Sequence, residues 1–441
     1  MKRSILSLAL TLSFLLITFV SIAQEILPRR AFIGLDMETL SLDRKEALGL
    51  AQDIYGIYVK GVYEGSPAEK GGIRTGDVID FMNETKINEP KDLLFAIKEI
   101  KNNATVTFSI YRNLKKKKVK VNLIPFPKEE SALFSTIYSA AISGGNIHRV
   151  IITKPKAQGK YPAVIMLQGV GCFSQDNMSY PAIRNIVDSL TMAGYVVMRV
   201  EKSGIGDSRG KPCNEINFEE ELGGYISGLK LLKEQPYVDP QNVFALGFSM
   251  GGIIAPVLHL QNKLKGIIAF GTIGKNWFEY ELENTRRQFI LANESLDSLD
   301  SFMRKEYNRV YGLFVAMATP TDIINKYPWT KDNLFIYPMS FAFFQQVAMI
   351  DISTLWMNTN TNVLAIHGSS DFVSSANEHQ MISDYVNIKN PGMGTYLELK
   401  NTDHFLNTAS SPKASLNGPP GKFNPEIIQV IKSWIEEKST P

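Results

Sequence analysis

The sequence predicts an α/β chain in two parts, a small β-rich unit followed by a larger unit with a mostly parallel sheet and helices on both faces. Residues 29–127 contain short alternating segments and one clear helical stretch, which is typical of a small β-rich unit. Beyond residue 131, short apolar runs rich in β-branched residues alternate with helical stretches, which indicates parallel strands buried on both faces. With 441 residues, 44% of them hydrophobic, the chain can bury a core in each part.

The first 23 residues have the pattern of a secretory signal peptide. Lys2 and Arg3 precede an apolar run that ends in Ser21-Ile22-Ala23, a small-x-small pattern that predicts cleavage after Ala23. A retained membrane anchor is the alternative interpretation. Because no second apolar run is long enough to span a bilayer, we expect a periplasmic or secreted mature chain without a membrane span.

Residues 29–127 resemble a PDZ domain of the bacterial periplasmic-protease type. The segments RAFIGLDM, GIYVKGVYEGSPAEKGGIRTGDVIDFMN and DLLFAIKEI occur in the family's order and at its usual spacing, although NETKI lacks the glycine that usually follows the asparagine. The resemblance implies a groove that binds an extended peptide as an added strand and holds its terminal carboxylate on backbone N–H groups. The residues expected in that carboxylate-binding loop are Phe32, Ile33, Gly34 and Leu35. The alternative is a groove that is empty or filled by the protein's own chain.

Charge and motifs exclude several classes of function. Without Lys2 and Arg3 the chain carries 45 basic and 44 acidic side chains, so no attraction to nucleic acid or an anionic membrane is expected. The basic cluster NLKKKKVKV from Asn113 lies between two alternating segments, which is typical of a solvated hairpin turn. No Cys/His cluster has metal-ligand spacing and no phosphate-binding glycine loop occurs, so we expect neither a metal nor another cofactor.

After the proline-bearing linker IPFPKEE, six apolar runs predict the strands of the second unit: RVIITKP, PAVIMLQG, YVVMRVE, NVFALGFS, GIIAFGT and NVLAIHG. The alternation stops over about 273–361. This insert is rich in aromatic residues, among them Trp277, Tyr280 and Trp356, at helical spacing. We expect a helical cap above the strand ends, with the aromatic side chains mostly in its core and substrate contact as the alternative for any one of them.

The stretch FALGFSMGGIIAP, residues 244–256, places small residues on both sides of Ser249. A buried strand, a Gly-x-Ser-x-Gly turn and a helix follow one another here, which is the pattern of a nucleophile elbow. The pentapeptide by itself is a weak signal and also fits a plain strand-to-helix turn. Its position between a strand and a helix favours a nucleophilic serine.

A nucleophilic serine needs a base, and the base needs a group that orients it. Asp371 follows the strand NVLAIHG, and His404 follows the next strand, YLELK. The order Ser249, Asp371, His404 is similar to that of the α/β-hydrolase superfamily, and the resemblance implies this fold for residues 131–441. The most similar subset is secreted bacterial esterases and serine aminopeptidase-like hydrolases. Asp403 is the rival acid, but it adjoins His404 in one loop, where its side chain is expected to point away.

Acyl transfer also needs donors aimed at the developing oxyanion. We expect the backbone N–H of Met250 and that of Val170 in LQGVGCF, with Gly171 as the alternative to Val170. Many relatives have His-Gly where this chain has Gln168-Gly169, a departure that leaves the backbone donor intact and changes the packing expected in this loop.

The turn RVEKSGIGDSRG resembles the family's Gly-x-Gly-x-Ser turn, and we assign no chemistry to its Lys202 or Asp207. Cys172 and Cys213 are the only cysteines of the chain, and the signal peptide directs both to a compartment where thiols oxidise. The family's sheet order implies that they end at the same edge, so a disulfide between them is a hypothesis.

Two classes of function follow. The first is an enzyme that cleaves carboxylic esters through an acyl-serine intermediate, with a peptidase using the same triad as the alternative because PDZ domains more often accompany proteases. Its substrate is a small-molecule ester or a short peptide. The second class is a non-catalytic scaffold whose PDZ groove binds the C-terminus of a partner.

Overall fold

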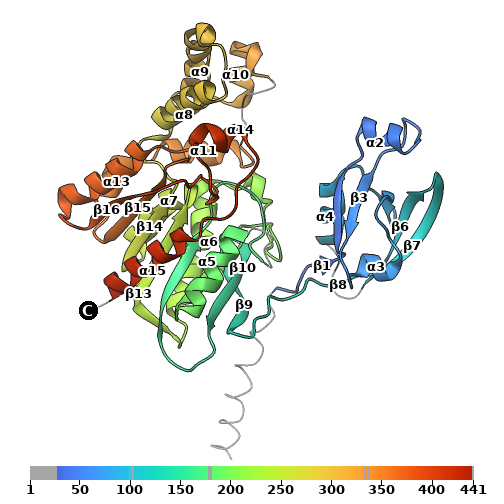
Figure 1. The fold of residues 1–441 in the computed structure, drawn as a ribbon, viewed down its shortest axis with the longest axis horizontal. Helices are drawn as coiled ribbons and strands as arrows, with labels where there is room; N and C mark the ends of the chain where they lie inside the picture. Colours follow the sequence, from blue (N-terminus) through green and yellow to red (C-terminus); the bar gives the residue numbers. More distant parts are fainter. Residues whose placement is uncertain are drawn as a thin grey trace, which may run out of the picture. The chain divides into compact units, whose positions relative to one another are not determined.

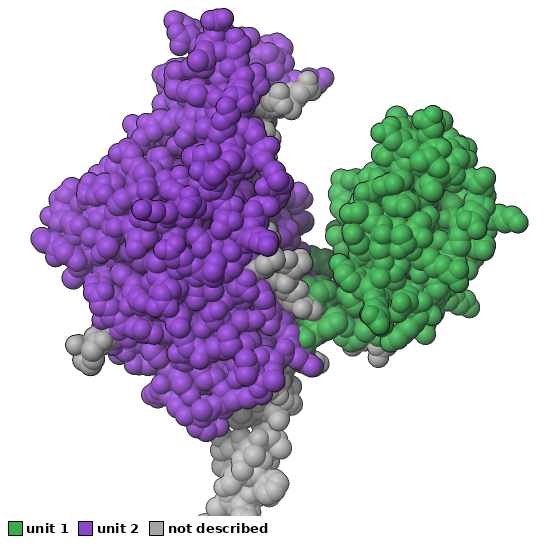
Figure 2. Space-filling model, viewed as in Figure 1, with its two compact units in different colours: residues 1–128 green, residues 129–441 purple. Residues whose placement is uncertain are grey.

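The computed structural model describes residues 27–98, 100, 104–176, 181–331, 334 and 337–439. The expected signal peptide, residues 1–23, lies outside these ranges. The chain divides into two compact units, and the division falls between Lys128 and Glu129 (Figures 1 and 2). None of the helices in the described ranges is both long and apolar enough to cross a membrane.

The first unit is built on an antiparallel sheet that curls around a small apolar core. Its strands run in the order β2 (Leu35–Thr39), β3 (Ile57–Val62), β4 (Val78–Met82), β6 (Thr105–Arg112) and β7 (Lys115–Asn122), and β5 (Thr85–Lys86) pairs with β4. A separate pair joins β1 (Ala31–Phe32) to β8 (Ile124–Pro125). Three short helices complete the unit: α2 (Leu42–Ala47), α3 (Pro67–Gly71) and α4 (Pro90–Lys98).

The basic cluster is a hairpin turn, as the sequence predicts. Asn113 and Leu114 both have positive φ, 52° and 61°, and connect β6 to β7 with Arg112 opposite Lys115. Two consecutive left-handed residues match the right-handed twist of the flanking strands. The exposed lysines on β7 therefore belong to a solvated strand face.

The second unit contains an eight-stranded sheet in the order β16-β15-β14-β13-β11-β12-β10-β9. The strands from β16 to β12 are parallel to their neighbours, whereas β10 is antiparallel to both β12 and β9. Their bounds are β9 (Phe134–Ser143), β10 (Asn146–Pro155), β11 (Tyr161–Leu167), β12 (Val196–Val200), β13 (Val238–Phe248), β14 (Gly266–Phe270), β15 (Asn362–Gly368) and β16 (Gly394–Leu399). This is the α/β-hydrolase order, and the predicted fold class is confirmed.

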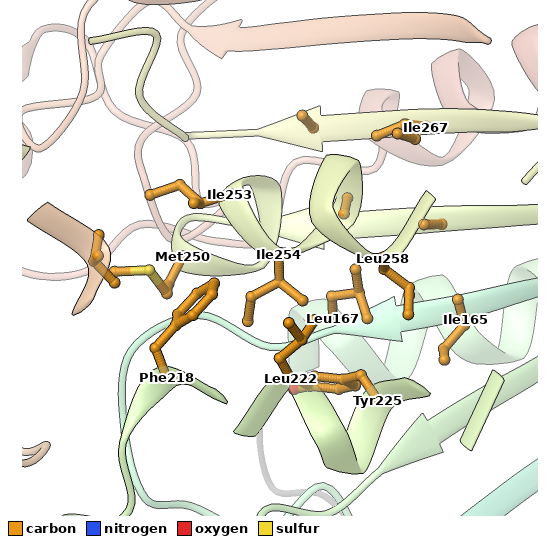
Figure 3. Packing of buried hydrophobic residues seen from close by; sticks show 14 of the residues in the cluster. Ile165, Leu167, Phe218, Leu222, Tyr225, Met250, Ile253, Ile254, Leu258 and Ile267 are labelled. Atoms are coloured by element: carbon orange, nitrogen blue, oxygen red, sulfur yellow. The ribbon is translucent and has the colours of Figure 1, made fainter. Parts of the chain in front are cut away.

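Helices cover both faces of this sheet because its strands are apolar on both sides. On β11, Val164 and Met166 pack in one core with α5 (Pro181–Met192) and α15 (Glu426–Ser439). The alternate residues Ile165 and Leu167 pack in the other core with α6 (Phe218–Lys233), α7 (Met250–Gln261) and α13 (Ala376–Lys389). Figure 3 shows Leu167 between α6 and α7. The α7 helix begins directly after Ser249, the residue that follows the end of β13.

Between β14 and β15 lies the helical insert that the sequence predicts. It contains α8 (Trp277–Leu291), α9 (Leu299–Phe314), α10 (Pro320–Lys326), α11 (Phe341–Ala348) and α12 (Ile352–Met357), with α8, α9 and α10 farthest from the sheet (Figure 1). Trp277 packs its ring 4.9 Å from that of Phe344. From α8, Arg287 donates to the Val373 carbonyl at 2.6 Å, which ties the cap to the loop after β15. A short helix, α14 (Pro412–Asn417), precedes α15.

Candidate active site

Ser249 occupies a strained turn between β13 and α7. Its backbone has φ 52° and ψ −117°, a conformation that non-glycine residues rarely adopt. The turn is held in place because the Ser249 N–H donates to the Phe270 carbonyl at 2.8 Å on the neighbouring strand. Such strain at the carboxyl end of a parallel strand is the geometry of a nucleophile elbow.

The glycines around Ser249 are required by close backbone contacts. A Cβ atom on Gly247 would lie 2.4 Å from the Gly251 carbonyl oxygen, and one on Gly251 would lie 2.1 Å from that of Leu167. On Gly252 it would lie 2.5 Å from the Thr272 Cβ. Real Cβ atoms do not approach other atoms this closely, so each of the three positions excludes a side chain. The small residues that the sequence displays are therefore the condition for packing the elbow against β11 and β14.

His404 and Asp371 form a hydrogen-bonded pair between the loops that follow β16 and β15. His404 Nδ1 lies 2.8 Å from Asp371 Oδ2, and Asp371 is 2% exposed. The carboxylate also accepts the Val373 N–H at 2.6 Å and both the N–H and hydroxyl of Ser374, at 2.9 and 2.7 Å. These contacts satisfy both carboxylate oxygens, so the side chain is fixed with one oxygen toward the imidazole.

The electrostatics of the pair favour an ionised acid and a basic imidazole. Burial would raise the pKa of Asp371, but His404 and the Ser374 hydrogen bonds outweigh it and lower that pKa to about 2. Burial would lower the pKa of His404, but the Asp371 carboxylate outweighs it and raises the pKa above its ordinary value. Gly271 lies against both side chains, since a Cβ there would be 3.0 Å from His404 Nδ1. No local sequence pattern marks this glycine as part of the site.

Asp403 has a different environment. One carboxylate oxygen accepts the N–H groups of Phe405 and Asn407 at 2.9 and 2.8 Å, and the other accepts the Ser415 hydroxyl at 3.3 Å. Asp403 thus closes its own turn. The geometry supports Asp371, and not Asp403, as the partner of His404.

Ser249 and His404 line one cavity of about 620 Å³ together with the two expected oxyanion donors, Met250 and Val170. Gly169 lies beside the serine, since a Cβ there would be 3.2 Å from the Ser249 Cβ. Within the described part of the chain, the N–H groups of Met250 and Val170 have no protein acceptor. Each is therefore available as a donor, and the binding of an oxyanion by the two groups stays a prediction.

The rest of the cavity lining is largely apolar and comes from four parts of the second unit. The loop after β11, the α5 helix and the loop after His404 contribute Phe173, Ile183, Phe405 and Leu406, and the cap side contributes Ile273, Trp277, Tyr280 and Tyr337. Three of the cap aromatics thus line the cavity as well as packing among themselves. No acidic side chain is among the described residues that line the cavity. The described ranges also contain no group of His, Cys, Asp and Glu side chains that could hold a metal ion.

Cys172 and Cys213 form a disulfide in the structure, with their Cα atoms 5.7 Å apart. Cys172 lies two residues after Val170, and Cys213 begins the short 3-10 turn before α6. The bond therefore fastens the loop that carries an expected oxyanion donor to the segment that leads into α6.

Lys202 makes contacts beside the site that no sequence pattern indicates. This lysine follows β12, and its Nζ donates to the Gly169 carbonyl at 2.8 Å and lies 3.0 Å from the Glu221 carboxylate of α6. On the same helix the Tyr225 hydroxyl accepts the Gln168 N–H at 3.0 Å. The sequence signal was weak, because a lysine in a loop is usually solvated and its partners are 33 and 19 positions away.

In the first unit, the expected carboxylate-binding residues 32–35 connect β1 to the edge strand β2, which packs near α4. Gly34 has φ 80°, and a Cβ there would lie 2.3 Å from that of Ser66. The Ile33 carbonyl accepts the Ala68 N–H at 2.9 Å. The segment is therefore a fixed loop beside an edge strand and a helix, and its binding of a peptide stays a prediction.

Comparison with known proteins agrees with these two units. Residues 31–123 match the PDZ domain family, and residues 177–396 match the family described as serine aminopeptidase, S33. The second match contains Ser249 and Asp371 and ends before His404.

Among curated proteins, the chain is 30% identical over 113 residues to a probable periplasmic serine endoprotease DegP-like of Bartonella henselae, covering 26% of this chain and 22% of that protein. It is 26% identical over 162 residues to Esterase EstD of Thermotoga maritima, covering 35% and 39%. The chain thus spans well under half the length of either relative. Among solved structures, Est1E from Butyrivibrio proteoclasticus with bound ferulic acid aligns at a TM-score of 0.46 and 15% identity, covering 68% of this chain and 98% of that one.

Proposed function

We propose that this chain, which joins a PDZ domain to an α/β-hydrolase domain of the serine aminopeptidase S33 type, hydrolyses carboxylic esters through an acyl-Ser249 intermediate. The observation that carries the proposal is the arrangement around one apolar cavity. Ser249 and His404 both line it, and Asp371 is hydrogen-bonded to His404 Nδ1. This arrangement supplies a nucleophile, a base and an orienting acid.

In the proposed reaction, His404 Nε2 takes the proton of Ser249 as the hydroxyl oxygen attacks the ester carbonyl. The hydrogen bond from Nδ1 to Asp371 keeps Nε2 unprotonated and stabilises the imidazolium that forms. The N–H groups of Val170 and Met250 bind the oxyanion. His404 then returns the proton to the leaving alcohol, and water hydrolyses the acyl-serine by the same steps in reverse order.

An ester is a better fit to the cavity than a peptide with a free amino terminus. An aminopeptidase binds the terminal ammonium group, which requires an acidic partner once water is excluded. The described lining of the cavity has no carboxylate, and its cap side is formed by aromatic and aliphatic side chains. We therefore expect small or slender apolar acyl groups, with peptidase activity as the second candidate because the matching family is described as serine aminopeptidase.

The place of action that fits this proposal is the periplasm or the exterior of the cell. Supporting observations are the disulfide and the similarity of the first unit to DegP-like proteins whose names place them in the periplasm. The PDZ unit would then bind an extended peptide or the C-terminus of a partner, and the non-catalytic scaffold is the weaker alternative.

The proposal is tested by covalent labelling and a substrate panel. A fluorophosphonate probe should label the wild-type chain and fail to label Ser249→Ala. On p-nitrophenyl esters, Ser249→Ala and His404→Ala should each lower kcat by about a thousandfold or more with the fold intact by circular dichroism, because triad members act as a unit. Aminoacyl-nitroanilides tested in parallel separate the esterase from the peptidase. A wild-type chain that is neither labelled nor active would leave the scaffold as the function.

A further inference from the structure

Lys202 is a buried cation that the proposed reaction does not use. Its side chain is 1% exposed, as is that of Glu221, and the two charged groups are 3.0 Å apart. Burying an ion pair seldom adds stability over a well-packed apolar pair, because removing both charges from water costs several kcal/mol per ion. The position of the ammonium group therefore calls for a reason beyond stability.

The second contact of Lys202 supplies that reason. Its Nζ donates to the Gly169 carbonyl at 2.8 Å, and this carbonyl belongs to the same planar peptide unit as the Val170 N–H. In a trans peptide the C=O and N–H bonds point in opposite directions. A cation bound to the oxygen thus fixes the orientation of the N–H and increases its partial positive charge, as hydrogen bonds in a chain polarise one another.

Three further contacts restrain the same loop. Tyr225 of α6 accepts the Gln168 N–H at 3.0 Å, one residue earlier. The disulfide at Cys172 holds the loop two residues after Val170. Gln168 Oε1 accepts the Gln175 amide at 3.1 Å across the loop. Each of these three contacts fixes the path of the backbone. Unlike them, Lys202 places a positive charge beside the Gly169–Val170 peptide unit.

We infer that Lys202, held by Glu221, is a positioning residue that orients and polarises the Gly169–Val170 peptide so that the Val170 N–H binds the oxyanion. The inference rests on the proposed function, since it deepens the same site. Lys202 touches neither the serine nor the substrate and acts through the Val170 N–H.

The main variant is Lys202→Met, which keeps the length of the side chain and removes its charge and donors. Because losing a whole oxyanion donor costs about a hundred- to a thousandfold in kcat, weakening one donor should lower kcat on p-nitrophenyl acetate by about ten- to a hundredfold. KM should change less than about threefold. The inhibition constant of a trifluoromethyl ketone, whose adduct with Ser249 places an oxyanion in the hole, should rise in proportion to the loss of kcat.

Lys202→Met leaves the Glu221 carboxylate buried without its cation, and this single variant can fail to fold. The double variant Lys202→Met/Glu221→Met removes both charges and so tests the loss of Lys202 in a folded protein. It should fold and retain the loss of kcat. The matched control is Arg149→Met/Asp207→Leu, which removes another buried ion pair, between β10 and the turn that follows β12, with 2.9 Å between Nε and Oδ2. This control should keep kcat within about threefold of the wild type, because neither side chain contacts the Gly169 carbonyl.

Two results would overturn the inference. In one, the folded Lys202→Met/Glu221→Met protein keeps wild-type kcat and ketone affinity; in the other, the Arg149/Asp207 control loses as much of both. If the wild type hydrolyses esters and Ser249→Ala does not, either result rejects only the role of Lys202, and the proposed function stands. If the wild type hydrolyses none of the esters, the proposed function and this inference are rejected together.

Discussion

At the scale of the residue, hydrogen-bond partners separate Asp371 from its rival, Asp403, since both carboxylates are buried. Asp371 is fully hydrogen-bonded and points one oxygen to His404, whereas Asp403 accepts bonds from its own turn. Asp371 lies in the loop that follows β15 and Asp403 in the loop that follows β16, and their hydrogen-bond partners differ. This difference makes the assignment of the acid testable by paired substitutions.

We expect Asp371→Asn to lower kcat on an activated ester by about a hundredfold or more, because the amide cannot hold His404 in the productive tautomer. Asp403→Asn should instead lower the free energy of unfolding and keep most of the activity, because it weakens a turn and not the imidazole. Steady-state kinetics and urea unfolding of both variants measure the two effects. Near-full activity in Asp371→Asn with loss in Asp403→Asn would reverse the assignment.

His404 also sets the expected pH dependence. Because its pKa is raised above the ordinary value of 6.5, the imidazole is protonated at low pH and cannot accept the serine proton. The kcat/KM of the wild type should therefore fall as pH decreases through an inflection above 6.5. Asp371, with its pKa lowered to about 2, stays ionised throughout this range and adds no second inflection.

In Asp371→Asn the inflection should move to lower pH, because the carboxylate that stabilises the imidazolium is gone while the burial remains. The measurement is kcat/KM against pH for both proteins on one p-nitrophenyl ester. A wild-type inflection below 6.5, or an inflection that does not move in the variant, would contradict this account.

At the scale of the element, loops after neighbouring strands build the site and one covalent bond joins two of them. The disulfide links the loop after β11 to the segment before α6, across a separation of 41 residues. A crosslink of this span restricts the unfolded chain, and native disulfides typically stabilise a fold by about 2–4 kcal/mol. It also holds the loop that contains Val170.

Cys172→Ser/Cys213→Ser should therefore lower the free energy of unfolding by about 2–4 kcal/mol and reduce kcat. Urea unfolding and ester kinetics of the double variant measure both quantities, and the wild type treated with a reductant serves as the comparison. Titration of wild-type protein from the periplasm should find no free thiol. Two reactive thiols in that material would reject the bond.

At the scale of the whole molecule, every residue proposed for the chemistry lies in the second unit. The first residue of that unit, Glu129, pairs with Arg199 at 2.7 Å, and both side chains are fully buried. A truncated chain must therefore keep Glu129, because without it the buried Arg199 would lose the carboxylate that it pairs with. Unit 1 has its own apolar core, formed by residues that include Ile57, Val59 and Phe108.

Removing residues up to Lys128 should leave kcat/KM on a small p-nitrophenyl ester within about twofold of that of the full chain. The reason is that a domain with its own hydrophobic core can fold and act separately. The loss should appear with an unstructured protein substrate that carries a hydrophobic C-terminus, since strand addition in the PDZ groove raises its local concentration. Comparing the two substrates on both chains is the measurement. Equal loss on both would make unit 1 part of the active site.

The sequence by itself determined the periodicities, the turn chemistry and the order of the chemical groups. Alternating and continuous apolar runs predicted the two kinds of sheet, and the glycines at 247, 251 and 252 predicted a turn too crowded for side chains. These features are local, because a strand, a helix or a tight turn is specified by residues within about one element of each other. The confirmed fold class follows from them.

Only the tertiary structure decided where the side chains of the loops point. Lys202 meets Gly169 and Glu221 because β12 lies beside β11 and α6 packs over both, and no local pattern encodes that meeting. The choice between Asp371 and Asp403, and the size of the cavity beneath Trp277 and Tyr280, likewise depend on how distant elements pack. The physical reason is that a loop side chain takes the orientation that satisfies its charge and hydrogen bonds among neighbours supplied by the whole fold.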